Sequence, residues 1–157
     1  MQKILSTSAH LAGVILLVCT LARPLSAKDK QQVTRPLRGL GLATILVTPN
    51  SPTVAMYHNE EDGNATHAGL YHNVADGTMS LETGQILTAN GTTTAANGDS
   101  VYWFWNVDKA IFDGGTGRFE QASGFVAMNV LSQETVPNED GTFTLTLLYQ
   151  FEGEFTY

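Results

Sequence analysis

Three histidines lie close to a run of carboxylates in the middle of the chain. His58, His67 and His72 surround the Glu-Glu-Asp run at residues 60–62. Imidazole and carboxylate groups together can hold a divalent metal ion, so this segment is a candidate metal site. However, His67 and His72 are five residues apart, a spacing that places them on opposite faces of a strand. We therefore expect the histidines at a strand start, on the surface or at a rim, with no metal and no other cofactor.

Arg118 is one of two cationic residues that follow Arg38 in the sequence, and the other is Lys109. Its planar guanidinium could hold the carboxylate of a ligand at the mouth of a cavity, which makes Arg118 a candidate cavity-lining and ligand-binding residue. Alternatively, it pairs with Asp99 or Asp113 and holds the glycine-rich turn beside it in place. The suitability of arginine for fixed ion pairs favours the second interpretation.

The densest aromatic run is Tyr-Trp-Phe-Trp at residues 102–105. Because side chains alternate along a strand, Trp103 and Trp105 share one face, and Tyr102 and Phe104 share the other. If the tryptophans point inward, they either fill the core or line a cavity for a flat, apolar ligand. We predict Trp103 and Trp105 as candidate cavity-lining residues, although core filling is the default because small barrels usually fill themselves with side chains. If they are exposed, Tyr102 and Phe104 would mark a partner-binding surface.

Motifs for common enzyme chemistry are missing from the sequence. It has no phosphate-binding glycine loop, no Gly-x-Ser-x-Gly elbow, no zinc-binding cysteine pair and no dinucleotide fingerprint. The carboxylates fall mostly in turn-like segments, such as residues 60–64, which we expect to form a solvated acidic loop. No acid/base pair stands out, so catalytic residues stay unassigned and the sequence favours a protein without catalysis.

Turn signals recur roughly every 8–15 residues and separate short strand-like segments. Asp76-Gly77 and Asn90-Gly91 are typical of hairpin turns, and residues 97–99 and 138–141 also indicate turns. Residues 142–150 alternate between apolar and polar side chains, as a half-buried strand does. These features predict an all-β domain over residues 39–157. We expect an antiparallel β-barrel of about eight strands, with a β-sandwich as the alternative.

The N-terminal segment has the pattern of a secretory signal peptide. Lys3 precedes an almost unbroken apolar run at residues 11–21, and Ala27 ends a segment suited to cleavage. We predict a signal peptide at residues 1–27, a flexible polar arm at residues 28–38, and a secreted or periplasmic protein. Cleavage would remove Cys19, the only cysteine, so no disulfide is expected.

After cleavage the chain would carry 6 Lys or Arg and 15 Asp or Glu residues, a net charge of −9. Nucleic acids and anionic membrane surfaces are bound by basic faces. We therefore expect no nucleic-acid partner and no membrane contact after cleavage of the signal peptide. The excess of negative charge favours solubility, and the sequence leaves the oligomeric state open.

Three segments carry a resemblance to known proteins. They are Gly-Asn-Ala-Thr-His-Ala-Gly at residues 63–69, Ala-Ala-Asn-Gly-Asp at residues 95–99 and Gly-Gly-Thr-Gly-Arg-Phe at residues 114–119. In this order and spacing they resemble a family of small exported bacterial β proteins. The style of the glycine-rich turns is also similar to that of the allene oxide cyclase and dirigent barrels. That similarity implies an eight-stranded barrel with a largely apolar central cavity, and it assigns no catalytic residue.

Three functions fit these features. The first is an exported barrel that binds a small apolar or aromatic ligand without catalysis. The second is a cyclase or isomerase of the allene oxide cyclase or dirigent type, whose barrel would shield a reactive molecule from water. The third is a surface protein that associates with itself or a partner through Tyr102 and Phe104. A cavity would favour the first two, and a buried carboxylate, histidine or tyrosine among apolar walls would favour the enzyme.

Overall fold

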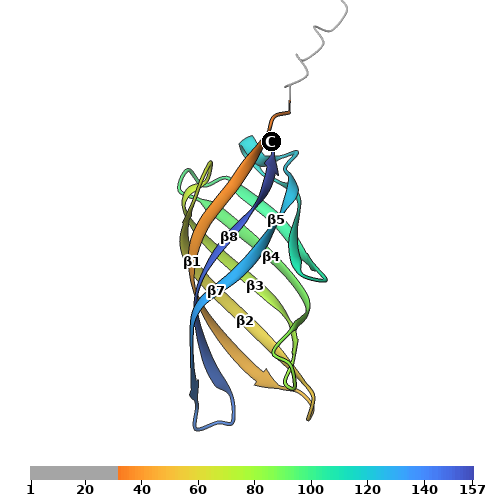
Figure 1. The fold of residues 1–157 in the computed structure, drawn as a ribbon, viewed down its shortest axis with the longest axis vertical. Helices are drawn as coiled ribbons and strands as arrows, with labels where there is room; N and C mark the ends of the chain where they lie inside the picture. The colour runs from red at the N-terminus through yellow and green to blue at the C-terminus, as the bar shows by residue number, and fades with distance from the viewer. Residues whose placement is uncertain (1–31) are drawn as a thin grey trace, which may run out of the picture. The chain divides into compact units, whose positions relative to one another are not determined.

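The structure is a computed structural model that describes residues 32–157, and these residues form a closed antiparallel β-barrel (Figure 1). Eight strands follow one another around the barrel in sequence order, and β8 closes the ring by pairing with β1. The predicted barrel is therefore confirmed, and the sandwich alternative is wrong. The predicted signal peptide at residues 1–27 lies outside the described residues.

The strands differ considerably in length, which shapes the wall of the barrel. They are β1 (Thr34–Pro49), β2 (Val54–Ala65), β3 (Gly69–Ser80), β4 (Ile86–Ala95), β5 (Ser100–Asn106), β6 (Lys109–Gly115), β7 (Ser123–Pro137) and β8 (Phe143–Thr156). A short 3-10 helix, η1 (Gly117–Phe119), lies between β6 and β7. Within residues 32–157, no helix has the length and apolar character needed to cross a membrane.

β1 begins at Thr34, earlier than the start at Gly39 that the sequence pattern indicated. Residues 34–38 therefore belong to the barrel, and the prediction of a flexible arm is wrong for them. The reason is tertiary, because β8 extends far enough to supply ladder partners for this end of β1. Leu37 points into the core with 5% of its surface exposed, whereas Arg35 and Arg38 are exposed. Arg38 lies on the outer face, whereas Arg35 shares the face of Leu37 but is exposed near the start of the strand, so both basic residues are compatible with a strand.

Two glycines that indicate hairpin turns in the sequence lie instead in the middle of long strands. Gly77 belongs to β3 and Gly91 to β4, so both predicted turns are wrong. Each glycine pairs directly across the sheet with an aromatic residue, Gly77 with Tyr57 and Gly91 with Trp103. A Cβ atom at either position would collide with the partner's ring. The glycines are needed for the close approach of a ring and not for a turn.

The same pairing of glycine with an aromatic residue recurs around the wall. Gly39 pairs with Phe151, Gly41 with Tyr149 and Gly63 with Tyr71, and a Cβ atom at each glycine would crowd its partner's ring. Each ring therefore covers the backbone of the neighbouring strand instead of extending to the barrel axis. Other inward positions carry alanine, including Ala43, Ala55, Ala75 and Ala89. Small residues and rings held against the wall together leave the middle of the barrel unfilled.

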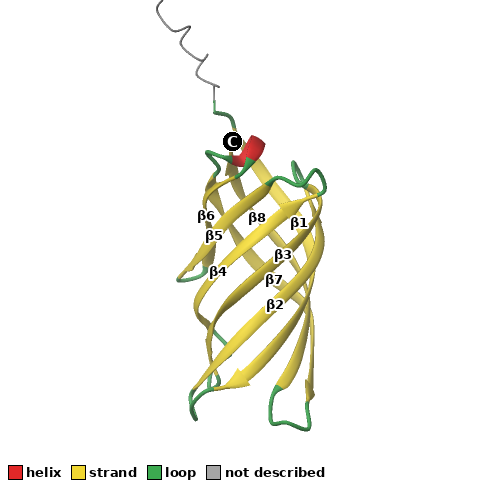
Figure 2. Ribbon diagram, turned by 180° about the vertical axis from the view of Figure 1, so that it is seen from behind, coloured by secondary structure: helices red, strands yellow, loops and turns green. Residues whose placement is uncertain are grey.

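Buried side chains form two apolar clusters inside the barrel. One cluster includes Phe119 and Phe155, and the other includes Val47 and Leu145. The clusters lie towards opposite ends, because Leu145 is near the start of β8 and Phe155 is near its end. The strands β2, β3 and β4 form the wall that faces the viewer in Figure 2.

The glycine-rich segment after β6 covers one end of the barrel, where η1 lies in Figure 1. η1 directs Phe119 into the core, where its side chain is fully buried. Gly117 has a φ of 56°, and a Cβ atom there would also collide with the carboxylate of Asp99. Glycine at this position therefore permits both the backbone conformation and the contact.

The ladders on one side of the barrel are short. β4 pairs with β5 only over residues 90–94, and β6 pairs with β7 only through residues 123–127 of β7. Residues 86–89 of β4 and 128–137 of β7 therefore have a neighbouring strand on one side only. Figure 1 looks onto this side, and the strands of the far wall are visible below β7. The wall is incomplete between these two strand edges.

Candidate functional site

The barrel contains a cavity of about 320 Å³. Apolar and aromatic side chains from all eight strands form most of its wall, and the volume falls in the range of small-molecule sites. Trp103 and Trp105, which the sequence indicated as cavity-lining residues, are part of this wall. They also pack against both apolar clusters. Their role in binding a ligand stays a prediction.

Arg118 is not among the residues that line the cavity, and its role in binding a ligand stays a prediction. Its Nε atom is 3.9 Å from Oδ2 of Asp99, and its backbone N–H donates a hydrogen bond of 3.2 Å to the same oxygen. The guanidinium group lies 4.5 Å from the centre of the Phe119 ring. These contacts agree with the second interpretation of Arg118, in which the residue pairs with Asp99. Arg118 thereby holds in place the turn that carries Phe119.

A buried carboxylate lies on the cavity wall. Glu61 of β2 is 4% exposed, and it is the one charged side chain among the residues in 32–157 that line the cavity. The hydroxyl of Tyr71 donates a hydrogen bond to Oε1, and Nδ2 of Asn73 donates one of 3.2 Å to Oε2. Both carboxylate oxygens therefore have a partner, which offsets part of the cost of removing the charge from water. Gly41 faces this group, where a Cβ atom would collide with Oε1.

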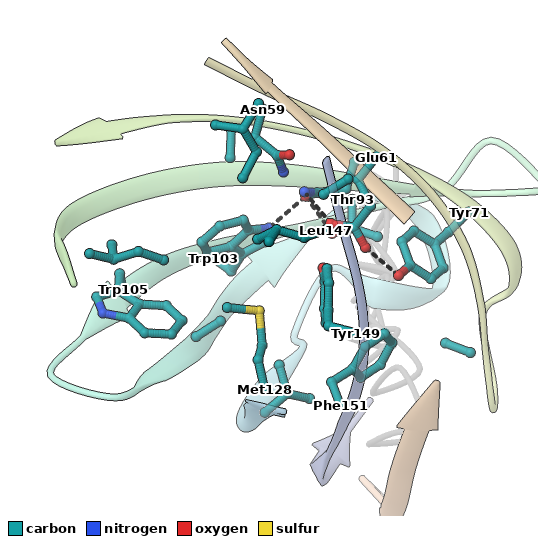
Figure 3. Close-up of a pocket in the computed structure, with 18 of the residues that line it drawn as sticks. Asn59, Glu61, Tyr71, Thr93, Trp103, Trp105, Met128, Leu147, Tyr149 and Phe151 are labelled. Carbon is teal, nitrogen blue, oxygen red and sulfur yellow. Dashed lines mark hydrogen bonds between the residues drawn. The ribbon is translucent and has the colours of Figure 1, made fainter. Parts of the chain in front are cut away.

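The hydrogen bonds continue through Asn73 along the wall towards Thr93 and Trp103, which are labelled in Figure 3. Oδ1 of Asn73 accepts a bond of 3.0 Å from the hydroxyl of Thr93 and one of 2.9 Å from the indole Nε1 of Trp103. The orientation of the Asn73 amide follows from these partners, because one end donates and the other accepts. The network links four strands, β2 to β5, and holds the Trp103 ring in place.

The register of the sheet brings this network together. Glu61 pairs with Asn73, and Asn73 pairs with Thr93, so three polar side chains stand in a row across β2, β3 and β4. Residues that pair directly lie on the same face of a sheet, which here is the inner face. Asn73 and Thr93 were not identified from the sequence, because their pairing depends on contacts between strands that the sequence does not display.

Residues 60–64 do not form the solvated acidic loop that the sequence indicated, because β2 continues to Ala65. Glu60 and Asp62 are exposed as expected, whereas Glu61 between them points inward. Because Glu60 and Asp62 point outward, the inward direction of Glu61 between them was not recognised from the sequence. The available signal was the alternation over residues 57–62, in which every second side chain belongs to the same face.

Three tyrosines reach the cavity with hydroxyl groups that stay protonated. Burial raises the pKa of Tyr57 to about 12, and the charge of Asp76 adds to this effect. Burial also raises the pKa of Tyr71 and Tyr149 far above the usual range, and the charge of Glu61 is the second cause in both. The Tyr71 hydroxyl therefore keeps its proton and remains a hydrogen-bond donor to the Glu61 carboxylate.

We expect these three tyrosines to ionise only when the barrel unfolds in alkali. The unfolded chain loses the three protons near pH 10 while the folded state keeps them, so stability is complete below about pH 10 and falls above it. Each group contributes a loss of up to about 1.4 kcal/mol per pH unit. Tyrosinate absorbance, followed together with circular dichroism, measures this. Tyr57→Phe should make the fall of stability with pH less steep, whereas the exposed control Tyr102→Phe should leave it unchanged. Ionisation of all five tyrosines of the chain in an intact barrel would contradict the expectation.

Asn59 places a second polar group on the cavity wall. The residue is 8% exposed, lies between Tyr57 and Glu61 on the inner face of β2, and lines the cavity. Its Oδ1 atom is buried and accepts no hydrogen bond from any group in residues 32–157. An unpaired buried polar group costs about 1–3 kcal/mol. A hydrogen-bond donor on a bound molecule would offset that cost.

The three histidines lie apart from one another and away from the cavity wall. Nδ1 of His58 is 2.8 Å from Oδ1 of Asp76, and Nδ1 of His72 is 2.9 Å from Oδ1 of Asp62. These two pairs are exposed and join β2 to β3. His67 lies in the turn between the same strands, and its Nε2 is 3.1 Å from a carbonyl oxygen of β1. In the described part of the chain, no group of three His, Cys, Asp or Glu side chains could hold a metal ion.

Tyr102 and Phe104 lie on the outer face of β5, with 44% and 37% of their surfaces exposed. This agrees with the alternation expected along residues 102–105, because Trp103 and Trp105 face the cavity. Whether the outer pair binds a partner stays a prediction.

The exposure of the lining residues shows where the cavity opens. Lining residues near η1, such as Phe119 and Phe155, are buried. By contrast, Met128, Val130 and Gln133 of β7 line the cavity and are exposed. These three residues belong to the part of β7 that has no strand on one side. The mouth of the cavity is therefore in the side of the barrel, between β7 and the start of β4.

One comparison with solved structures agrees with this architecture. No family model matches the chain, and no curated protein is similar to it in sequence. The solved structure of the pterocarpan synthase dirigent protein GePTS1 is similar, with a TM-score of 0.52 and 13% identity, covering 80% of this chain and 91% of that chain. For the pterocarpan synthase dirigent protein PsPTS1 the TM-score is 0.48 and the identity 14%, with 77% and 94% covered. At this identity the likeness to GePTS1 shows only that the two chains have a similar fold.

Proposed function

We propose that this protein binds a small apolar or aromatic molecule inside its barrel. The observation that supports this most directly is the cavity of about 320 Å³ with a largely apolar wall. Eight-stranded barrels are often just wide enough for their own side chains to fill them. Here the pattern of residue sizes, with rings against glycines and alanines facing the middle, preserves space for a ligand. The signal peptide predicted at residues 1–27 supports a secreted or periplasmic site of action.

The polar groups on the wall restrict the chemistry of the ligand. Glu61 and Asn59 present oxygen atoms that accept hydrogen bonds, and both lie on the inner face of β2. The indole rings of Trp103 and Trp105 offer flat apolar surfaces on the same cavity. These features favour a mostly apolar molecule that carries one or two hydrogen-bond donors, such as hydroxyl groups on a ring.

The test is a titration with N-phenyl-1-naphthylamine, a neutral aromatic amine whose fluorescence increases in apolar surroundings. Both tryptophans of the chain line the cavity, so energy transfer from tryptophan to the dye reports occupancy of the cavity itself. We expect one dye molecule to bind per chain with a micromolar dissociation constant, as is usual for a ligand of this size. A dye that does not bind the folded protein would contradict the proposal.

Substitutions on the two faces of β5 provide the control. Trp105→Ala removes an inward ring and should weaken dye binding by at least about tenfold in a folded protein, because a flat contact surface is lost. Phe104→Ala removes an outward ring from the same strand and should change dye binding by less than about twofold. Unfolding of the Trp105→Ala variant would instead assign that ring to the core, and equal losses in both variants would place the dye elsewhere.

A second function, cyclisation or isomerisation of the bound molecule, is favoured by the buried carboxylate. Glu61 lies among apolar walls with the Tyr71 hydroxyl at its side. A carboxylate in such a place can take a proton from one atom of a bound molecule and return it to another, which rearranges bonds without adding or removing atoms. The structural neighbour GePTS1 is described as a pterocarpan synthase, but it is similar only in fold. Support for catalysis therefore comes from Glu61.

The substitution Glu61→Gln separates binding from catalysis, because the amide keeps the shape of the side chain and cannot transfer a proton. The molecule that copurifies with the protein would be extracted, identified by mass spectrometry and incubated with wild type and variant. Catalysis predicts an isomeric product whose rate of formation falls by about 10²–10⁴ in the variant. Dye affinity should change by less than about tenfold. A molecule left unchanged by the wild type would leave binding as the function.

A further inference from the structure

The negative charge inside the barrel has no positive partner. Glu61 is the only charged side chain in residues 32–157 that lines the cavity, and no Lys, Arg or His of that part of the chain lies within ion-pair distance of it. Its hydrogen-bond donors, the Tyr71 hydroxyl and the Asn73 amide, are both neutral. They occupy one acceptor position on each oxygen, and a carboxylate has about four such positions in all. A cation that enters the cavity therefore meets a buried carboxylate that no protein charge neutralises.

Aromatic rings lie close to this carboxylate. A Cβ atom at Gly41 would collide with Oε1 of Glu61, and it would lie 2.9 Å from the Tyr71 hydroxyl and 3.0 Å from Cζ of Tyr149, so these side chains converge on one point of the wall. The ring centroid of Phe151 is 6.0 Å from that of Tyr71 and 6.2 Å from that of Tyr149. The three rings line the cavity and are labelled with Glu61 in Figure 3. The face of an aromatic ring attracts a cation, and more strongly where water is excluded.

The unpaired oxygen of Asn59 indicates that the cation carries N–H groups. Oδ1 of Asn59 is buried without a hydrogen-bond partner in residues 32–157, and the residue lines the same cavity two positions before Glu61 in β2. Neighbours on one face of a strand are about 7 Å apart. A protonated primary amine has three N–H donors, and two hydrogen bonds of about 2.9 Å from one nitrogen can reach acceptors on both side chains. One ammonium group therefore suits Asn59 and Glu61 together.

The charge of the whole barrel favours a cation over an anion. Residues 32–157 contain four Lys or Arg and fourteen Asp or Glu, a net charge of −10. The two segments that flank the cavity mouth, residues 82–89 and 128–137, include Glu82 and Glu134 and have no Lys or Arg. Such a field raises the local concentration of cations and lowers that of anions. A positively charged molecule is therefore attracted to the mouth before it contacts the cavity wall.

We propose that the ligand of this barrel is an organic cation, namely a protonated amine on an apolar or aromatic body. The ammonium group donates hydrogen bonds to Glu61 and Asn59 and contacts the tyrosine rings beside them, while the apolar wall packs against the remainder of the molecule. Removing an ammonium ion from water is costly, and the carboxylate and the rings offset that cost inside the barrel. This inference rests on the proposed binding function, and it assigns the charge of the ligand, which the size and apolar character of the cavity leave open.

Three naphthalene derivatives of similar shape test the sign of the charge. At neutral pH, 1-naphthylmethylamine is a cation, 1-naphthalenemethanol is uncharged and 1-naphthoate is an anion. Each is titrated against bound N-phenyl-1-naphthylamine, which is excited directly, so that displacement of the dye reports occupancy of the cavity. We expect the amine to bind at least about tenfold more tightly than the alcohol, because hydrogen bonds between charged groups are the stronger ones. The naphthoate should bind at least about tenfold more weakly than the alcohol, because its charge would face that of Glu61.

Glu61→Gln removes the buried charge and keeps the shape of the side chain. In this variant the preference for the amine over the alcohol should fall below about threefold, and the affinity for the alcohol should change by less than about threefold. Glu60→Gln is the matched control, because it removes the same charge from the exposed neighbouring position of β2. It should change the affinity for the amine by less than about twofold at physiological salt. An equal loss in both variants would assign the preference to the overall charge of the barrel and overturn the proposed site.

The comparison of the three naphthalenes on the wild type needs no variant. Equal affinity for the amine and the alcohol, or tighter binding of the alcohol, would overturn the inference and leave the binding function standing. So would an amine that binds the protein without displacing the dye, because it would then occupy the acidic outer surface. The binding function fails in a different way, namely when neither the dye nor any of the three naphthalenes binds the folded protein, and the inference then fails with it.

Discussion

Phe119→Ala is expected to lower the free energy of unfolding by about 3–5 kcal/mol. Phe119 is fully buried, and its ring centroid lies 5.4 Å from that of Phe155 and 5.6 Å from that of Tyr157. It is the side chain through which η1 is anchored in the barrel. The strands around it are held by their ladders and cannot close over the space that remains, so the loss includes a cavity contribution as well as the lost burial.

Urea unfolding followed by circular dichroism measures this effect. The midpoint should fall with an unchanged slope, and the melting temperature should drop by roughly 10–20 °C for a domain of this size. Phe104→Ala is the matched control, because it makes the same substitution on the outer face, where the side chain is 37% exposed. Its loss should stay below about 1 kcal/mol. Similar losses in the two variants would show that Phe119 does not hold this end of the barrel together.

Gly91→Ala is expected to disturb both the stability of the barrel and the shape of its cavity. The new Cβ atom would collide with the Trp103 ring and lie 2.7 Å from its Nε1 atom. The ring must then move away from the wall, which breaks its hydrogen bond to Asn73 and places it in the cavity. We expect a loss of about 1–3 kcal/mol in stability, as for other overpacked positions, and weaker binding of the dye.

A double-mutant cycle shows whether the ring is the cause. Alanine at position 91 should cost less when Trp103 is also alanine, with a coupling energy of at least about 1 kcal/mol between the two sites. The neighbouring residue provides the control, because Asn90 is exposed on the outer face opposite Phe104 and away from the Trp103 ring, so Asn90→Ala should change stability by less than about 0.5 kcal/mol. Strictly additive losses for Gly91 and Trp103 would rule out the proposed packing.

Local patterns predicted those strands and turns whose signals act within a few residues. The alternation over residues 142–150 corresponds to β8, and the turn indicated at residues 138–141 is present, with Gly141 at a φ of 85°. The turn at residues 97–99 is likewise present, with Gly98 at a φ of 86°. In these turns the left-handed backbone conformation is a local requirement, which glycine satisfies on its own.

The same residue type was misleading where its role depends on a distant strand. Gly77 and Gly91 follow Asp and Asn as turn glycines do, yet each lies within a strand under the ring of a residue far away in the sequence. The residues next to such a glycine in the sequence do not indicate that a ring from another strand covers it. The position of β1 was misjudged for a similar reason, because β8 supplies the partners that make residues 34–38 a strand.

The candidate site likewise combines residues that local sequence patterns predict with residues whose positions depend on contacts between strands. Trp103 and Trp105 could be assigned to one face from their spacing, and both line the cavity. For Arg118 the sequence favoured an ion pair with Asp99 or Asp113, and the hairpin between β5 and β6 decided the choice by bringing Asp99 to it. Glu61 was hidden between two exposed acidic residues, and its inward direction follows from the length of β2.

The amino-acid sequence by itself determined that this chain forms an all-β domain of antiparallel strands and favoured a barrel, because alternation and turn residues act over short distances. Only the tertiary structure decided that the strands close into a ring and what the ring contains. Register between strands brings Glu61, Asn73 and Thr93 into one row, and unequal strand lengths open the wall beside β7. Both depend on pairing between segments far apart in the chain, and pairing energies accumulate along whole strands instead of at single residues.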